Sequence, residues 1–284
     1  ATYATYMAYV ISRFTGIGYS FTAHAHDIYM DQTMLAEKVR KADLVVPISE
    51  FNRRLLVSLC PEASAKIRVV YCGVDTETFH PVERPANDPG SPAGPLKIVA
   101  VARMQEYKGI RYLVTACRLL RDRGIEFHST LIGDGPERRE IEQAILHKGL
   151  RDVLDCVGWL PSSEVAAYIA QADVVVLPSV VARDGMMDGL PNVLMEALSC
   201  SVPVVSTTIS GIPELVDSGR NGLLVPPADP DALADALAEL AGDPARRRLM
   251  GEEGRKRVLA TFDLINNTQQ KARLLDNVVH RTLA

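Results

Sequence analysis

Two basic side chains stand on one short segment, Arg103-Met104-Gln105-Glu106-Tyr107-Lys108, between an apolar run and the helix expected after it. Lys108 comes just before that helix, where the amide dipoles already make the helix end positive, so its placement is unfavourable. An anion held between Arg103, Lys108 and the helix end would offset this conflict. Seen alone, the loop is explained equally well by two solvated surface charges.

A second segment combines two acids with a helix start, in Asp188-Gly189-Leu190-Pro191-Asn192-Val193-Leu194-Met195-Glu196. Gly189 is expected to open a helix that begins near Pro191, and the exposed amides of its first turn can hold a phosphate. Glu196 lies inside the helix, where a carboxylate could accept hydrogen bonds from vicinal hydroxyls of a sugar or ribose. The spacing alone favours a simpler interpretation, in which Asp188 caps the helix and Glu196 is a surface residue.

Gly133-Asp134-Gly135-Pro136 also follows an apolar run. Its glycines would let the backbone approach a ligand closely, but a tight turn is the simpler explanation. The third glycine of the dinucleotide-binding GxGxxG pattern is missing. An NAD-binding domain is therefore disfavoured.

Two further segments suggest metal or acid–base chemistry. His24-Ala25-His26-Asp27 places two histidines near a carboxylate at a strand end, but no third and fourth metal ligand accompanies them. A hydrogen-bonded structural histidine is the simpler reading. Asp229-Pro230-Asp231 matches a DxD metal pattern, yet it stands before a helix and is expected to cap it. No metal site is predicted.

The segments that must position these residues alternate between strand and helix, which is typical of parallel βαβ units. The first part of the chain shows this order, with Ser49 expected to cap a helix and Met34, Leu35 and Val39 expected on one helix face. The expected helices are 1–11, the one containing Met34 and 50–59, and the expected strands are 19–23, 44–48 and 67–71. Residues 1–11 show helical spacing with no capping residue before them, so the chain is expected to begin inside a domain.

Residues 81–95 hold five prolines and two glycines without apolar periodicity, which is linker composition. After them the alternation restarts, with strands that are apolar at nearly every position, as in a parallel sheet covered on both faces. The expected strands are 97–102, 127–132, 153–157, 174–177, 202–206 and 222–225, and the expected helices include 109–123, one near Pro136, and 231–240, 244–259 and 263–283. This order predicts a doubly wound α/β domain.

Composition excludes several classes of protein. With 284 residues the chain is long enough for two domains, and its formal net charge of −4 argues against nucleic acid as the main partner. The five cysteines form no CxxC pair and no metal-ligand spacing, so idle thiols in a reducing compartment are expected. No apolar run reaches the roughly 20 residues that span a bilayer, and no signal peptide is recognised.

Taken together and in this order, the segments resemble glycosyltransferase family 4, retaining enzymes of the GT-B fold. The resemblance runs from Tyr19-Ser20-Phe21-Thr22-Ala23-His24 to Gly222-Leu223-Leu224-Val225. Its strongest part, from Leu177-Pro178-Ser179 to Glu214, is similar to the family's "PS…EG-P…EA…PVV…PE" signature. Ile48-Ser49-Glu50 and Gly73-Val74-Asp75…Phe79 also match family patterns.

The resemblance implies two Rossmann-like doubly wound domains, of which the first is incomplete. Residues 1–80 would be the remnant of the acceptor-side domain, 81–95 the linker, 96–262 the nucleotide-sugar-binding domain, and 263–284 a helix packing back toward the first domain. The family's N-terminal glycine-rich acceptor loop has no counterpart in this sequence.

The resemblance also assigns roles to the candidate residues. Arg103 and Lys108 match the pair that binds the donor diphosphate, His24 matches the active-site histidine, and Glu196 matches the second acid of the E-x7-E motif, which holds the ribose. Asp188 falls on the first acid, which faces the sugar and is usually Glu, so its reach is shorter. The remaining nucleotide-contacting positions are Gly133, Asp134, Gly135, Leu160, Gly189, Leu190, Asn192 and Val193. Further departures from the family pattern are Cys72, Ser201 and Ser210.

The activity implied is metal-independent, retaining transfer of a sugar from a UDP-, GDP- or ADP-type donor to an acceptor hydroxyl. No cofactor is expected; the acceptor would be a sugar or lipid-linked molecule in polysaccharide or glycolipid synthesis. The location implied is cytoplasmic, compatible with peripheral contact at the membrane face. Two alternatives stay open: a GT-B sugar-nucleotide epimerase and a non-catalytic nucleotide-binding fragment.

Overall fold

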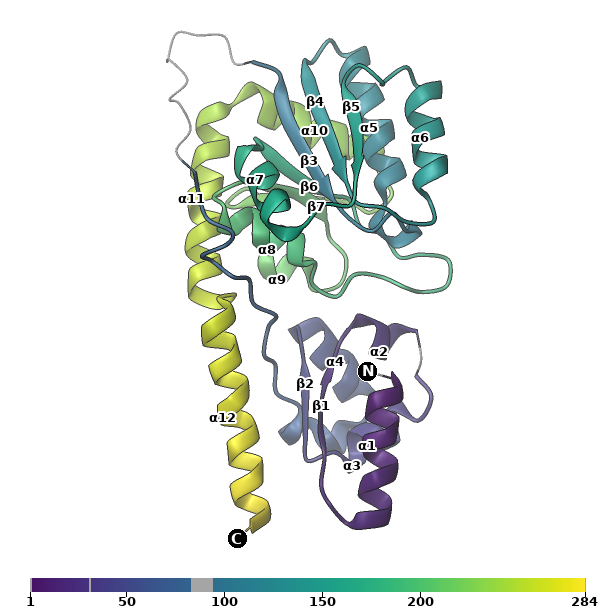
Figure 1. Ribbon diagram of the computed structural model, residues 1–284, viewed down its shortest axis with the longest axis vertical. Helices are drawn as coiled ribbons and strands as arrows, with labels where there is room; N and C mark the ends of the chain where they lie inside the picture. Colours follow the sequence, from purple (N-terminus) through teal and green to yellow (C-terminus); the bar gives the residue numbers. More distant parts are fainter. Residues whose placement is uncertain (1, 31, 83–93, 284) are drawn as a thin grey trace.

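The computed structural model describes residues 2–30, 32–82 and 94–283 and arranges them as two α/β units, with two successive C-terminal helices running in line beside them (Figure 1). The expected linker, 81–95, lies largely outside the described residues, because 83–93 are not among them. Within the described ranges, no helix combines the length and the apolar character needed to cross a bilayer.

The first unit is built on a two-stranded parallel sheet, in which Ser20 of β1 pairs with Leu44 of β2. Its core contains Ile28, Leu56 and Ile67, whose side chains are fully buried. Its elements in chain order are α1 (Thr2–Thr15), β1 (Ser20–Ala23), α2 (Ala25–Tyr29), α3 (Leu35–Lys41), β2 (Leu44–Pro47), α4 (Glu50–Leu59) and the 3-10 helix η1 (Pro61–Lys66).

Three features of this unit differ from the sequence expectations. Residues 67–71 are not a strand: Ile67 makes one isolated bridge to Val45, after which the chain follows β2 only through single bonds such as that from Val70 N to Pro47 O. Met34 is not on the buried helix face, because it precedes α3 in a left-handed conformation with φ 56° and its side chain is exposed. Helix α2 was not expected, since five residues are too few to show a helical period.

The second unit is a six-stranded parallel sheet in the order β5-β4-β3-β6-β7-β8, which confirms the doubly wound arrangement. The chain proceeds outward from β3 to β5 on one side and then from β6 to β8 on the other, so the strand order switches direction between β3 and β6. The strands are β3 (Leu96–Val101), β4 (Phe127–Ile132), β5 (Leu154–Gly158), β6 (Val174–Leu177), β7 (Val204–Thr207) and β8 (Gly222–Val225).

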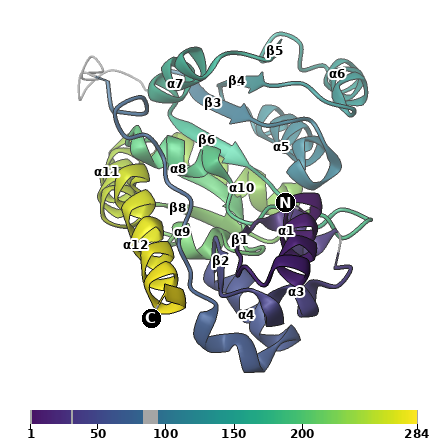
Figure 2. The same ribbon diagram turned by 60° about the horizontal axis from the view of Figure 1, so that its bottom comes forward.

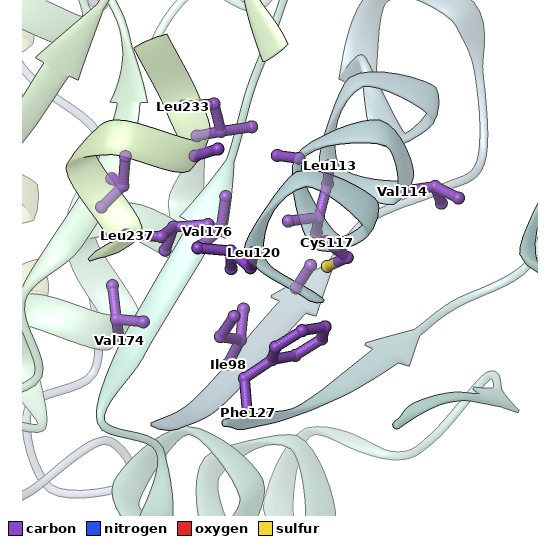
Figure 3. Close-up of a cluster of buried hydrophobic side chains, with 14 of the residues drawn as sticks. Ile98, Leu113, Val114, Cys117, Leu120, Phe127, Val174, Val176, Leu233 and Leu237 are labelled. Atoms are coloured by element: carbon purple, nitrogen blue, oxygen red, sulfur yellow. The ribbon is translucent and has the colours of Figure 1, made fainter. Parts of the chain in front are cut away.

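Helices cover both faces of this sheet. On one face α5, α6 and α10 bury an apolar layer in which Leu120 of α5 and Leu237 of α10 lie near Ile98 and Val176 of the sheet (Figure 3). On the other face α7, α8, α9 and α11 cover residues such as Val175. The helices are η2 (Glu106–Lys108), α5 (Ile110–Asp122), α6 (Arg138–His147), α7 (Ser162–Gln171), α8 (Asn192–Ser199), α9 (Ile212–Leu215), α10 (Pro230–Gly242) and α11 (Pro244–Thr261).

The last helix, α12 (Leu264–Leu283), follows α11 and extends beside the first unit on the side of β2 (Figures 1 and 2). Leu274 and Val278 of α12 pack against an apolar cluster of that unit, made of Leu44, Val46 and Val70. The two sheets are thereby held in one molecule by packing as well as by the chain that connects them.

Candidate functional site

The candidate residues of the second unit gather at the carboxyl edge of its sheet, where β3, β4, β5 and β6 end. Because these strands are parallel neighbours, the loops that follow them lie side by side. The loop after β3 contacts the loops on both sides of it: Met104 N donates to Asp134 O at 2.8 Å, and Val180 N donates to Tyr107 O at 2.9 Å. This loop is therefore the centre of the edge, beside the switch in strand order.

Gly109 brings the loop after β3 against the loop after β6. Its φ is 66°, in the left-handed region, and a Cβ at this position would lie 1.9 Å from the carbonyl oxygen of Pro178. Only glycine combines this conformation with this approach. Lys108 is placed as a result at the crevice between β3 and β6.

Lys108 forms an ion pair with Asp188, with 2.5 Å between Nζ and Oδ1 and only 15% and 9% of the two side chains exposed. The second carboxylate oxygen, Oδ2, accepts a hydrogen bond from Ser179 Oγ at 2.6 Å. The anion that the position of Lys108 requires is thus supplied by the chain itself. The capping interpretation of Asp188 is wrong, because the residue preceding α8 as its cap is Pro191.

Ser179 was not singled out as a functional residue in the sequence. The signal for it was present in the Pro178-Ser179 pair of the matched signature. Its hydroxyl is fully buried, and it holds Asp188 in one orientation.

Arg103 lies on the rim of a pocket of about 490 Å³ on the other side of the same loop. Four other predicted nucleotide-contacting residues line this pocket with it: Gly133, Asp134, Gly135 and Leu160. Three strand ends, those of β3, β4 and β5, therefore meet around one cavity. The remaining lining is mainly apolar and consists of Val101, Ala102, Ile132, Trp159 and Val165.

Trp159 and Asp134 are the aromatic and the acidic residue of this pocket. Trp159, not anticipated as a site residue, is 75% exposed beside the pocket, an unusual position for so large an apolar side chain. Asp134 accepts hydrogen bonds from the Gly135 amide at 2.7 Å and from Arg138 at 2.9 Å. These two donors lower the pKa of the Asp134 carboxyl, the amide having the larger effect.

Helix α8 begins at Asn192, next to the expected start near Pro191, so Gly189 and Leu190 belong to the loop before it. The amides of Asn192 and Val193 head the first turn, and no group in the described part of the chain accepts a hydrogen bond from them. Leu190 and Val193 are buried in the apolar layer beneath. The helix start is the one part of this segment that faces the edge with free donors.

Glu196 lies one turn further along α8 and is half-buried, not fully exposed as its spacing suggested. This burial raises the pKa of its carboxyl from 4.5 to about 7. Desolvation is the sole cause of this shift, and among residues 2–30, 32–82 and 94–283 no side chain or amide pairs with the carboxylate. Glu196, Lys108 and Asp188 do not line the pocket that holds Arg103. The structure thus divides the predicted set among a pocket, an ion pair and a half-buried acid.

His24 stands in the first unit, at the start of α2, where its backbone N donates to Asp27 Oδ2 at 2.9 Å. Partial burial lowers the pKa of the His24 imidazole, and Asp27 opposes this effect. The next residue, Ala25, reaches Gly189: a Cβ on Gly189 would lie 3.5 Å from that of Ala25. His24, the residue before Ala25, therefore belongs to the segment that meets the Asp188-Gly189 loop across the interface.

The Asp229-Pro230-Asp231 motif lies at the start of a helix. Asp229 caps α10 as expected, with its carboxylate accepting from Ala232 N at 2.9 Å. No group of three or more His, Cys, Asp or Glu side chains with the spacing of a metal site occurs in the described ranges. None of the five cysteines, all of which lie in the described ranges, forms a disulfide.

Replacing Glu196 by glutamine should change how stability depends on pH. Between pH 4.5 and 7 the unfolded chain gives up the Glu196 proton before the folded chain does, so folding loses stability as pH rises through this window. The melting temperature of the unchanged chain should fall relative to that of Glu196→Gln across the window and stay level above it. Thermal unfolding below pH 4.5 is the internal control, because Glu196 is neutral in both states there. Parallel melting curves at every pH would contradict the assignment.

Comparison with known proteins agrees with this geometry. Residues 95–243 match the model of the family described as "Glycosyl transferases group 1". A protein of Escherichia coli (strain K12) named as the colanic acid biosynthesis glycosyltransferase WcaL is 44% identical over 200 residues, which cover 70% of this chain and 48% of that protein.

Two solved structures share the fold, which is GT-B. The sucrose-phosphate synthase of Thermosynechococcus elongatus superposes with a TM-score of 0.82 at 25% identity, covering 98% of this chain and 72% of that one. Anabaena HepE in complex with UDP and glucose superposes with a TM-score of 0.80 at 22% identity, covering 97% and 76%.

The chain spans about half the length of the curated relative it matches. The family match covers more than half of its 284 residues and includes every strand of the second sheet. The chain therefore belongs to the glycosyl transferases group 1 family.

Proposed function

We propose that this chain carries the donor-binding half, and part of the acceptor-binding half, of a glycosyltransferase. The enzyme transfers a sugar from a nucleotide diphosphate sugar to an acceptor hydroxyl. The observation that carries the proposal is the position of the loop from Arg103 to Lys108, between a pocket of nucleoside size and the Lys108–Asp188 pair. A nucleoside in the pocket would place its diphosphate over both cations.

Bond cleavage in the donor leaves negative charge on the diphosphate, and this edge offers positive charge for it. An ammonium group has three N–H donors, so Lys108 can keep its bond to Asp188 and still bind a phosphate. Arg103 and the amides of Asn192 and Val193 add further donors. These groups are fixed before the reaction, which is how electrostatic stabilisation lowers a barrier, and they form the basis of a metal-independent mechanism.

Asp188 is suited to orient the sugar. Each of its oxygens already accepts from a donor, Lys108 or Ser179, which makes the carboxylate a poor nucleophile. This favours direct attack by the acceptor on the face from which the leaving group departs, and so retention of configuration. His24, with its lowered pKa, would be neutral near pH 7 and able to hydrogen-bond a sugar hydroxyl from the opposite unit.

Glu196 is assigned to the ribose. A half-buried carboxylate without a donor gains most from a ligand that brings two hydroxyl donors, and the vicinal hydroxyls of a ribose do so. Closure of the first unit over the edge would then exclude water from the reacting atoms.

The donor is assigned to the UDP, GDP or ADP class, with UDP supported by the fold shared with HepE, which binds UDP and glucose. The acceptor is assigned to polysaccharide or lipid-linked sugar chains, in line with the colanic acid biosynthesis named for WcaL. A cytoplasmic location with peripheral contact at the membrane completes the proposal.

The reaction type is tested by titrating UDP, GDP, ADP and their sugars, followed by product analysis with and without an acceptor alcohol. An acceptor-dependent glycoside with the donor's anomeric configuration is the expected product. Epimerised sugar formed without acceptor would indicate the alternative reaction, and nucleotide binding without any turnover would indicate a non-catalytic fragment.

Lys108→Ala should lower kcat/KM by about 30- to 10³-fold, equivalent to about 2–4 kcal/mol of transition-state stabilisation, because the leaving diphosphate loses a fixed cation. The matched control is Lys97→Ala, an exposed lysine near the opposite end of the same strand, β3, which should keep full activity. Steady-state kinetics with the preferred donor measures both. Unchanged turnover in Lys108→Ala would rule out its role.

Asp188→Ala should impair sugar transfer far more than nucleotide affinity, because Asp188 is assigned to the sugar and its loss leaves Lys108 free for phosphate. Calorimetric titration with the nucleoside diphosphate and a turnover assay give the two quantities. Asp184→Ala, an exposed acid on the same loop, is the control. Equal losses of affinity and turnover would show that Asp188 does not act on the sugar.

A further inference from the structure

The N-terminus of α4, in the first unit, is bound by a carboxylate of the second unit. Ser49 caps the helix by accepting from Asn52 N at 3.1 Å, and the amides of Glu50 and Phe51 remain. Both donate to Glu214 of α9, at 2.7 Å to Oε2 and 2.7 Å to Oε1 respectively. One side chain therefore satisfies two helix-end donors that lie 164 and 163 positions away in the sequence.

The two hydrogen bonds to Glu214 are stronger than ordinary ones between neutral groups. A carboxylate that accepts from two amides makes charge-assisted hydrogen bonds, roughly twice as strong as neutral ones. It also lies at the positive end of the helix dipole of α4. Glu214 is also held through its backbone, because Arg257 donates a hydrogen bond to its carbonyl oxygen.

A second contact between the units lies beside the first. Tyr29 Oη of α2 is 3.0 Å from Ser210 Oγ, which in turn donates to Gly189 O at 3.2 Å. Tyr29 also donates to Asn52 of α4. The loop after β7 thereby links α2 and α4 to the segment that carries Asp188.

The backbone between these contacts is built for close approach. Ser210 has φ 50°, which is unfavourable for a residue with a side chain. A Cβ on the next residue, Gly211, would lie 2.7 Å from Gly189 O and 3.0 Å from Ser49 Cβ. The two units could not meet in this way with a larger residue at position 211.

We propose that Glu214 is a positioning residue for the transfer reaction: it clamps the start of α4 to the second unit and so holds His24 opposite the Asp188-Gly189 loop. The reaction itself rests on the function proposed above. Glu214 has both carboxylate oxygens engaged and acts through α4, without touching the reacting atoms. Its removal would leave the donor-binding edge intact and release the unit that faces it.

The clamp is tested by hydrogen–deuterium exchange at the amides of Glu50 and Phe51 in the full chain. Glu214→Gln replaces one acceptor oxygen with an NH₂ group that cannot accept, so the exchange rates of these amides should rise about tenfold or more. The control is Asp229→Asn, the same carboxylate-to-amide change at a helix start within one unit. Exchange in Glu214→Gln as slow as in the unchanged chain would overturn the clamp.

A second variant approaches the contact from the other side. Glu50→Pro removes the amide that donates to Glu214 Oε2 and leaves Glu214 itself unchanged, and proline is favoured at the first position of a helix. The Phe51 amide should then exchange faster, as in Glu214→Gln. If Glu214→Gln alone fails to fold, Glu50→Pro decides the proposal, and a protected Phe51 amide in that variant would contradict it.

Kinetics separate positioning from binding. Both clamp variants should lower kcat about tenfold while the donor KM changes less than twofold, because the donor contacts belong to the second unit. Glu214→Asp, which keeps the charge with a shorter reach, should recover part of kcat. Faster amide exchange with unchanged kcat would overturn the positioning role. Absence of turnover in the unchanged chain would refute the proposed function, with the exchange result still deciding the clamp.

Discussion

The ion pair between Lys108 and Asp188 is the interaction on which the candidate site depends. It joins the loops after β3 and β6, which are neighbouring strands at the point where the strand order switches direction. Little of either side chain is exposed, so either charge alone would be costly to keep there. Ser179 completes the arrangement by satisfying the second oxygen of Asp188. The Lys108 ammonium is thereby fixed at the carboxyl edge of the sheet, where ligands of such sheets bind.

The loops that carry this pair follow strands of a sheet that is packed on both faces. Apolar layers cover both faces, and helices such as α5 and α8 are packed against strands that are buried along their length. Close packing of this kind transmits small displacements instead of absorbing them. The pocket that Arg103 lines and the Lys108–Asp188 pair are both placed by loops at the carboxyl edge of this packed sheet. Glu214 extends the same rigidity across to α4 of the first unit.

Much of the fold could be predicted, and the reason is visible in particular elements. The bounds of β6 and β8 agree with the expected residues, because strands buried on both faces are apolar at nearly every position. Residues 67–71 have the same apolar composition but form one bridge only, since composition does not say whether a partner strand offers its bonds in register. The start of α8 at Asn192 agrees with the expected start near Pro191, because proline is tolerated in the first turn of a helix and not in its interior.

The sequence by itself determined which loops carry chemistry and in what order, because strand and helix periods are local and each candidate follows a strand. Tertiary structure alone decided how those candidates are used. Lys108 meets Asp188 across 80 positions, and Glu214 meets Glu50 across 164. Glu196 is half-buried and has no hydrogen-bond or ion-pair partner among the described residues, although its spacing suggested an exposed residue. Contacts over such distances depend on how the two faces of the sheet and the two units pack, and no local pattern of residue types records that packing.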